Sequence, residues 1–412
     1  MEFRFVAPAI IITLTSCCAQ PALEEFASWT FLDFENNSAA DYVPENNVFT
    51  GIQVSKERVF LSLPNLRRGQ PVTLATIPAT SAGIKNPLLK PFPNWQWQRG
   101  SKDNCHSLVS VFRTRLDPCG RLWVLDSGSV NVMVQSEQIC PPKLLTFDAE
   151  SGKELDRVVI PEKLLGSDFQ MVALALDTKH SDQLLESCDH TASMVVYMSA
   201  NVGNMVVYER KTRHFWRHTH QTFSPDEKHA NISIQGEILN MPDGVLGMTV
   251  GFYRGRKVLF YHPLAGLQIY ALPVSALQLQ KSHHLRPIKI WKKSSQGAGL
   301  IVNNQGHLIF SPLSELEVLS LDFEERKLEL LAQDAEKLQF VSDMAFSPSG
   351  DLWILADKFH AYMNMKFSKN GTNLRVLRIQ GENKPQRHCK DLFVVDCKGS
   401  KCFFKLFPCI KR

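Results

Sequence analysis

The chain has 412 residues, of which 44% are hydrophobic and 21% are charged, and its formal net charge is +5. This composition excludes wholesale disorder and a multi-spanning membrane protein. The basic residues are spread along the chain, which argues against nucleic-acid binding. At about 150 residues per domain, the length allows two or three domains or one large all-β unit.

The first 19 residues have the features of a signal peptide. Arg4 supplies a positive charge, residues 5–14 are mostly apolar, and small residues precede Ala19, after which we expect cleavage. The alternative, a membrane anchor, is disfavoured because the apolar run is short and lacks a stop-transfer flank. We therefore expect a secreted, extracellular protein without a membrane span.

Eight cysteines remain after the leader, and an even number in a secreted chain favours disulfides. A zinc site is the alternative for the last four, but their spacing lacks a paired C-x2-C pattern and the compartment is oxidising. Three sequons predict glycosylation at Asn36, Asn231 and Asn370. The cysteines are Cys105, Cys119, Cys140, Cys188, Cys389, Cys397, Cys402 and Cys409.

Short apolar runs separated by turn residues follow one another from residue 48 onward, and long helical periods are scarce. They form six groups of about four predicted strands. The groups are 48–54, 58–63 and 72–77; 108–115, 121–127, 143–147 and 155–160; 171–177, 193–199, 205–209 and 214–217; 244–251, 257–261, 267–272 and 288–292; 299–302, 307–311, 317–321 and 328–332; and 341–346, 352–356, 362–367 and 374–379.

Three of these groups contain the same local signature, a tight turn whose glycine precedes a strand opened by leucine. Gly120, Gly306 and Gly350 supply the positive φ that closes such a hairpin. Six similar sheets in series predict a six-bladed β-propeller over residues 20–380, with residues 29–34 supplying an outer strand that closes the ring. Two packed β-sandwiches are the alternative, but they need a central linker that the sequence lacks.

The propeller layout also predicts two disulfides. Cys105 and Cys140 fall on one rim, and Cys119 and Cys188 fall on the opposite rim. Because bonded cysteines need Cα atoms within about 7 Å, the pairs Cys105–Cys140 and Cys119–Cys188 are favoured over the crossed alternatives. Asp126, at the end of its strand, is interpreted as a structural hydrogen-bond acceptor.

Several motifs in the right order resemble the Yellow/major royal jelly protein family of insects. The most specific match runs from residue 105 to 128 and includes the segments VSVFR and CGRLWVLDSG. Segments 42–51, 93–95, 140–144 and 243–248 are also similar. The resemblance covers residues 26–380 and leaves the cysteine-containing tail, 381–412, unmatched. It implies a secreted six-bladed propeller, and the family's roles include pigmentation, dopachrome conversion, amine capture and nutrition.

The resemblance also implies a ligand site at the mouth of the central channel. Amine-binding members use a Ser or Thr, an Asn and an aromatic residue on the last blade, and the matching positions are Ser342, Asp357 and Phe359. Asp357 stands where that pattern has Asn, so it either pairs with an ammonium group or abolishes the site. The structural alternatives are a backbone-bonded Ser342, an Asp357 paired with Lys358 or solvated, and a core Phe359.

Other polar residues give weaker signals. Asp243 is a second candidate channel carboxylate, with a turn-forming aspartate beside Gly244 as the alternative. His214, His218 and His220 are close in sequence, but we expect their strand to end near residue 217 and their side chains to be solvated. We therefore predict no metal and no cofactor.

Two functional hypotheses follow. The first is a secreted, monomeric protein that holds a small aromatic amine or catechol in its channel and acts in a pigmentation or melanin pathway. The second is an enzyme, either a dopachrome-converting isomerase or a calcium-dependent hydrolase. The isomerase needs an acid or base at the channel, and calcium needs more oxygen ligands than Asp243, Asp343 and Asp357. A structural or nutritive role without small-molecule chemistry is the remaining alternative, and whether the protein is an enzyme stays open.

Overall fold

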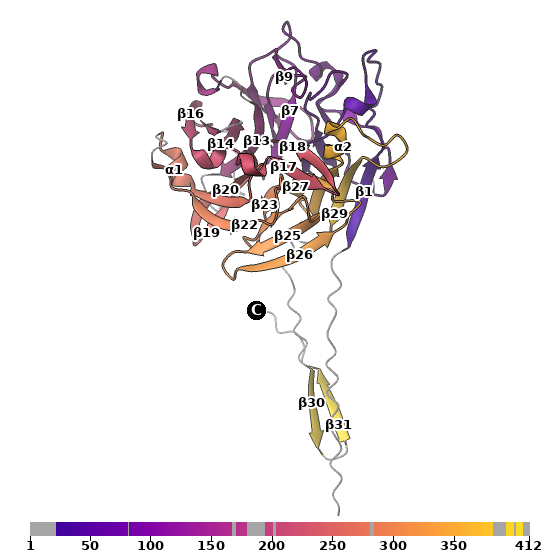
Figure 1. Cartoon of the computed structure of the whole chain (residues 1–412), viewed down its shortest axis with the longest axis vertical. Coiled ribbons are helices and arrows are strands. Elements are labelled where there is room, and N and C mark those ends of the chain that lie inside the picture. Colours follow the sequence, from indigo (N-terminus) through magenta and orange to yellow (C-terminus); the bar gives the residue numbers. More distant parts are fainter. Residues whose placement is uncertain are drawn as a thin grey trace, which may run out of the picture.

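The computed structural model describes residues 22–80, 82–166, 170–178, 194–200, 203–280 and 284–381, and the backbone of two further strands at 393–398 and 401–406. The main body is all-β, and its antiparallel sheets are arranged around an axis as a six-bladed β-propeller (Figure 1). The predicted fold class is therefore confirmed.

Each blade is a meander whose first strand lies at the channel. From the channel outward, the first three blades are β2 (Gly51–Val54), β3 (Arg58–Ser62), β4 (Leu74–Pro78) and β6 (Lys90–Pro91); β7 (Val111–Leu116), β8 (Arg121–Asp126), β11 (Lys143–Asp148) and β12 (Glu154–Val159); and β13 (Met171–Thr178), β14 (Met194–Ala200), β15 (Asn204–Glu209) and β16 (His214–Thr219).

The other three blades repeat this order. They are β19 (Val245–Tyr253), β20 (Arg256–Pro263), β21 (Gln268–Pro273) and β22 (Ile288–Lys292); β23 (Leu300–Val302), β24 (Leu308–Phe310), β25 (Glu317–Asp322) and β26 (Lys327–Gln333); and β27 (Phe340–Phe346), β28 (Leu352–Asp357), β29 (Leu374–Ile379) and β1 (Leu23–Trp29), which also pairs with β5 (Ile84–Lys85).

Short elements connect or extend the blades. The hairpin of β17 (Asn231–Ile234) and β18 (Glu237–Asn240) contacts the helix α2 (Phe359–Met363). The remaining elements are β9 (Ser129–Val130), β10 (Glu137–Gln138), α1 (Val274–Gln278), the 3₁₀ turns at Pro44–Asn46, Trp95–Trp97, Glu162–Leu164, Gln221–Phe223 and Glu227–His229, and the tail hairpin of β30 (Phe393–Lys398) and β31 (Lys401–Leu406).

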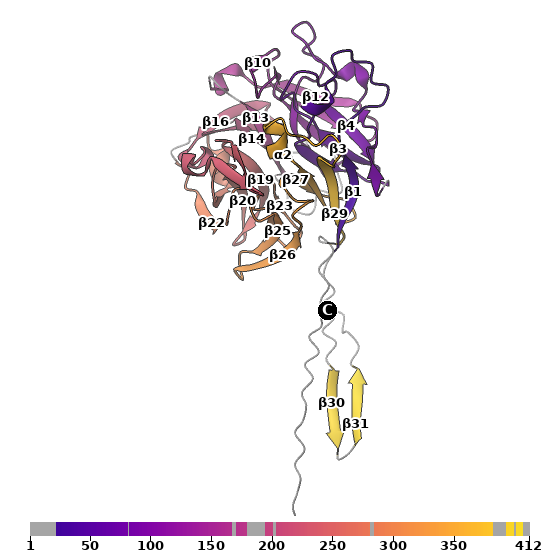
Figure 2. The ribbon, with the colours of Figure 1, turned by 45° about the vertical axis from the view of Figure 1, so that its right-hand side comes forward.

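The ring is closed by strands from distant parts of the chain. The inner strands contact one another in the order β2, β7, β13, β19, β23, β27 and back to β2. In the last blade, β1 is the antiparallel neighbour of β29 (Figure 2). The predicted closure by an N-terminal strand is therefore present, but the strand is Leu23–Trp29 and not 29–34.

The last blade also corrects a second prediction. The sequence predicts that residues 362–367 form its third strand, but the chain makes α2 and an irregular loop there. Strand β29 pairs directly with β28, and β1 takes the outer position. The segment is excluded from the sheet because strands from the two ends of the chain already fill all four positions.

The predicted hairpin glycines adopt the backbone conformation that the turns require. Gly120, Gly306 and Gly350 have φ values of 71°, 86° and 85°. Each lies one or two residues before a blade's second strand, so the sharp reversal returns the chain beside the inner strand. Because φ is positive, any residue with a side chain is strained at these three positions.

Apolar side chains fill the spaces between neighbouring blades. Tyr197 of blade three and Tyr261 of blade four belong to one buried cluster, as do Ile309 of blade five and Ile354 of blade six. Burying each large side chain contributes roughly 1.5–3 kcal/mol. Adjacent blades therefore stabilise one another around the ring. None of the helices in the described part of the chain is both long and apolar enough to cross a membrane.

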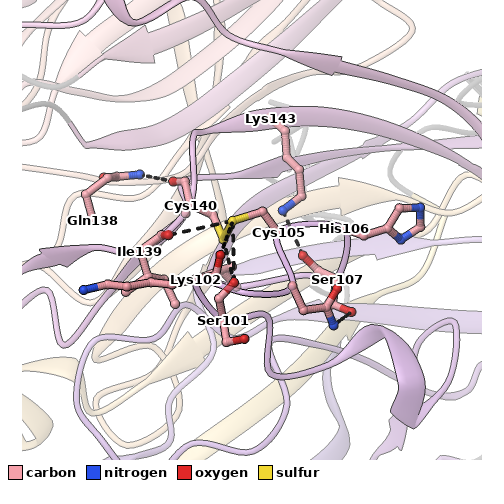
Figure 3. Close-up of a disulfide and its surroundings, with 12 residues drawn as sticks. Ser101, Lys102, Cys105, His106, Ser107, Gln138, Ile139, Cys140 and Lys143 are labelled. Carbon is pink, nitrogen blue, oxygen red and sulfur yellow. Dashed lines mark hydrogen bonds between the residues drawn. A yellow bond between two sulfur atoms is a disulfide. The ribbon is translucent and has the colours of Figure 1, made fainter.

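One disulfide ties together the loops of the second blade. Cys105 and Cys140 are bonded, with their Cα atoms 5.4 Å apart, which is the pairing that the rim argument predicts. Figure 3 shows Lys143 beside this bond, donating through Nζ to the backbone oxygen of Ser107 at 2.8 Å. Cys119 is also disulfide-bonded, but its predicted partner, Cys188, lies outside the described residues.

Replacing both Cys105 and Cys140 with alanine is expected to lower the free energy of unfolding by about 2–4 kcal/mol, because the bond closes a long loop. Equilibrium urea denaturation of the double variant measures this loss. Peptide mapping of the unreduced protein should recover the Cys105–Cys140 peptide pair and a Cys119–Cys188 pair. A Cys119–Cys140 peptide pair would contradict both the structure and the rim assignment.

Candidate functional site

A cavity of about 220 Å³ lies at the end of the channel where the inner strands begin. Its wall comes from the starts of β7, β13, β19 and β27 and from the loops that precede them. Most of the lining side chains are apolar, and polar groups reach it at only a few points. The lining residues are Thr50, Leu66, Phe112, Arg113, Val132, Met133, Gln170, Val172, Met241, Asp243, Leu246, Phe340, Ser342 and Phe359.

Three of the four predicted ligand residues line this cavity. Ser342 begins the bulged part of β27, Phe359 is the first residue of α2, and Asp243 precedes β19. Asp357, the fourth, ends β28 and is buried behind Ser342 without lining the cavity. The propeller thus brings Asp243 to the same cavity as two residues that lie about 100 positions later in the sequence.

Asp243 is the carboxyl group with the simplest environment. Its side chain has no hydrogen-bonding or ionic partner among the residues that the structure describes. Removal from water raises its pKa to about 6, and burial is the cause. Asp243 therefore presents to the cavity an uncompensated acid that ionises just below neutral pH.

Ser342 and Asp357 form a buried pair at the side of the cavity. The Ser342 hydroxyl donates to Oδ2 of Asp357 at 3.1 Å, while Oδ1 of Asp357 is buried without a hydrogen bond. Burial raises the pKa of Asp357 well above its ordinary value, so its negative charge is disfavoured. Lys358, its suggested partner, instead contacts Glu336 at 3.3 Å.

Phe359 serves both as core and as cavity wall. Its ring packs against Phe340 with centroids 5.0 Å apart and against Tyr362 at 5.6 Å, and the residue is only 3% exposed. Since Phe340 and Phe359 both line the cavity, the last blade offers it two aromatic side chains. Such a wall suits an aromatic ring and also provides π-faces for a cation.

The main site residue that sequence reasoning missed is Arg113. Arg113 and Arg115 are two residues apart on β7, so both side chains lie on its channel face. Asp343 of β27 accepts from Nη1 of Arg115 at 3.0 Å and lies 3.9 Å from Nε of Arg113. Arg113 also lines the cavity. The sequence signal that could have identified Arg113 is the presence of two arginines on one face of a strand whose other residues are mostly apolar.

The clustered histidines differ from expectation. β16 continues to Thr219, and His218 is fully buried, with Nε2 lying 2.8 Å from the backbone oxygen of Leu277. His220 instead caps the following 3₁₀ turn. Within the described ranges, no group of three or more His, Cys, Asp or Glu residues is placed to hold a metal ion. Asp343 is already paired with arginine, which disfavours a calcium set with Asp243 and Asp357.

The architecture defines a six-bladed β-propeller with a small, mostly apolar cavity at one end of its channel. The family model described as major royal jelly protein matches residues 109–389, and the chain belongs to that family. This agrees with the motifs found between residues 105 and 380.

Curated relatives cover most of the chain at low identity. Dopaminechrome tautomerase of Drosophila melanogaster is 26% identical over 393 residues, covering 87% of this chain and 82% of that protein. Protein yellow of Drosophila erecta is 24% identical, covering 90% and 71%. Among solved structures, a Bacteroides thetaiotaomicron protein of unknown function is 10% identical, covers 86% of this chain and 74% of that chain, and has a TM-score of 0.50, which supports the fold alone.

Proposed function

We propose that this protein binds a small aromatic amine or catechol derivative in the channel cavity and acts in a pigmentation pathway. The observation that carries the proposal is the unpaired Asp243 carboxylate in an otherwise largely apolar cavity. The ammonium group of a ligand supplies a positive partner for this carboxylate. Phe340 and Phe359 supply a surface for the aromatic ring of the ligand. The cavity is smaller than the roughly 300–1,000 Å³ typical of drug-sized ligands, which favours a ligand of one or two rings.

A second candidate is tautomerisation of an aminochrome, as the name of the Drosophila melanogaster relative suggests. The specific observation in its favour is an acid at the cavity with a pKa of about 6, close to the value that suits a general base at neutral pH. Asp243 would remove a proton from a ring carbon, and a quinone oxygen would gain one. The reaction is an isomerisation, so it needs no oxidant or reductant.

Secretion and glycosylation are further parts of the proposal. The Cys105–Cys140 disulfide supports an oxidising compartment. The three sequon asparagines, Asn36, Asn231 and Asn370, are all exposed, as attachment of a glycan requires.

Calorimetry with dopamine at pH 5 to 8 tests the role of Asp243. Dopamine remains cationic in this range, while the pKa of Asp243 is about 6. The carboxylate therefore becomes ionised as the pH rises, and binding should be about tenfold tighter at pH 7 than at pH 5. Asp243→Asn should weaken binding at pH 7 by about 10- to 100-fold and abolish this pH dependence.

The matched control is Asp226→Asn, which changes an exposed aspartate that does not line the cavity and should leave binding unchanged. Adding dopaminechrome and following its absorbance separates the two candidates. Accelerated decay that Asp243→Asn abolishes would establish turnover, whereas binding without accelerated decay would leave a binding protein. If dopamine, L-DOPA and dopaminechrome all fail to bind, the proposal is wrong.

A further inference from the structure

Arg113 carries a buried guanidinium that the protein satisfies only in part. The residue is 2% exposed, and its Nη2 donates to the backbone oxygen of Ser342 at 2.8 Å. Its Nε is buried without a hydrogen bond. Because leaving a buried charged donor unpaired is costly, a binding partner for Arg113 is expected to come from the cavity that it lines.

The charges around Arg113 point to an anionic partner. Asp343 is shared between two arginines, since it accepts from both Nη1 and Nη2 of Arg115 while lying 3.9 Å from Arg113. The nearby Asp357 is hydrogen-bonded to Ser342, and no ion pair links it to Arg113 among the described residues. Arg113 is thus the one arginine among the residues that line the cavity, and it shares the carboxylate of Asp343 with Arg115.

Two unlike charges therefore face the same small cavity from different blades. Arg113 belongs to the inner strand of blade two, and Asp243 precedes the inner strand of blade four. A ligand with only an amine pairs with Asp243 and leaves the buried Nε of Arg113 without a hydrogen-bond acceptor. A ligand with an amine and a carboxylate carries the opposite charge for each of them, and the planar guanidinium fits a carboxylate well.

We propose that the cavity selects aromatic amino acids and their carboxylated derivatives over the corresponding decarboxylated amines, and that Arg113 is the specificity-determining residue. This inference rests on the proposed function, since it places the ligand ammonium at Asp243. It narrows the ligand class from aromatic amines in general to those that keep an α-carboxylate.

Four probes separate the carboxylate from the catechol: L-DOPA, dopamine, tyrosine and tyramine. In calorimetry at pH 7, the affinity of each amino acid should exceed that of its amine by about tenfold or more. The reason is the charge-assisted hydrogen bond that the ligand carboxylate gains with Arg113. The preference should be similar with and without the second ring hydroxyl. A different result is that L-DOPA and dopamine both bind tightly while tyrosine and tyramine do not. This would assign Arg113 to a catechol oxygen and overturn the inference.

Arg113→Gln should reduce the ratio of L-DOPA to dopamine affinity to about twofold or less. Arg113→Lys, which keeps the charge but loses the planar fork, should give an intermediate ratio. The control is Arg375→Gln, which alters another buried arginine, one that pairs with Glu25 and does not line the cavity, and it should keep the full ratio. Circular dichroism checks that each variant is folded.

Equal affinity for the acids and the amines in the unmodified protein would overturn this inference and leave the proposed function intact. A preference for the acids that survives in both Arg113 variants would overturn the assignment to Arg113. Failure of all four probes to bind would overturn the inference and the proposed function together.

Discussion

Replacing Asp126 with alanine should lower the free energy of unfolding by about 3–5 kcal/mol. The carboxylate is fully buried and pairs with Lys143 at 3.0 Å. It also accepts backbone hydrogen bonds from Val109, Ser110 and Gly128 at 2.9–3.0 Å. The substitution leaves three buried amide groups without their acceptor and removes the negative charge that pairs with the buried ammonium group of Lys143. Urea denaturation followed by tryptophan fluorescence measures the loss.

An exposed ion pair provides the control for Asp126. Asp41 contacts Arg99 at 2.8 Å, but its side chain is 66% exposed, so Asp41→Ala should cost less than about 1 kcal/mol. Asp126→Asn retains an oxygen acceptor and should be milder than Asp126→Ala, which keeps the prediction measurable if the alanine variant does not fold. Equal losses for Asp41→Ala and Asp126→Ala would contradict this account.

Replacing Lys293 with methionine should stabilise the protein at neutral pH and flatten its pH dependence. Lys293 is 2% exposed, and its Nζ lies 3.1 Å from Nδ1 of the fully buried His262. Burial lowers the pKa of Lys293 to about 7, so the unfolded chain binds the proton more tightly than the folded one. Methionine fills similar volume without the cost of burying an ammonium group.

The sign of the pH effect follows from this lowered pKa. Between about pH 7 and 10.5 the unfolded state holds more protons, so the contribution of Lys293 to stability improves as the pH rises. The change is about 3 kcal/mol between pH 7 and 9.5. Urea midpoints across this range should therefore rise more steeply for the unmodified protein than for Lys293→Met. The exposed neighbour Lys292 is the control, because Lys292→Met should keep the steeper slope.

The blade architecture could be predicted because its signals are local. The turns at Gly120, Gly306 and Gly350 and the short apolar runs around them depend on only a few residues each. The details of the last blade could not, because they depend on pairing between β1 and β29 at the two ends of the chain. Nothing in segment 362–367 itself indicates that its position in the sheet is already occupied.

The same distinction applies to the cavity. Ser342, Phe359 and Asp243 were selected from motif resemblance and from their positions at strand ends, and the fold brings these three together. Arg113 was missed because an arginine in a strand is usually solvent-exposed. Only the closed ring shows that this one is buried and that its neighbours come from the last blade. The burial of His218 has a similar cause, since Leu277, which it contacts, lies in another blade.

Pairing between β1 and β29 has a consequence during biosynthesis. Arg378 of β29 and Glu24 of β1 form an ion pair across 354 residues of sequence. At about 5–20 residues per second, the ribosome synthesises β1 roughly 20–70 s before it synthesises β29. During this interval β1 has an unpaired edge that invites association with other chains. A chaperone that protects β1 until synthesis of the last blade should therefore increase the yield of folded protein.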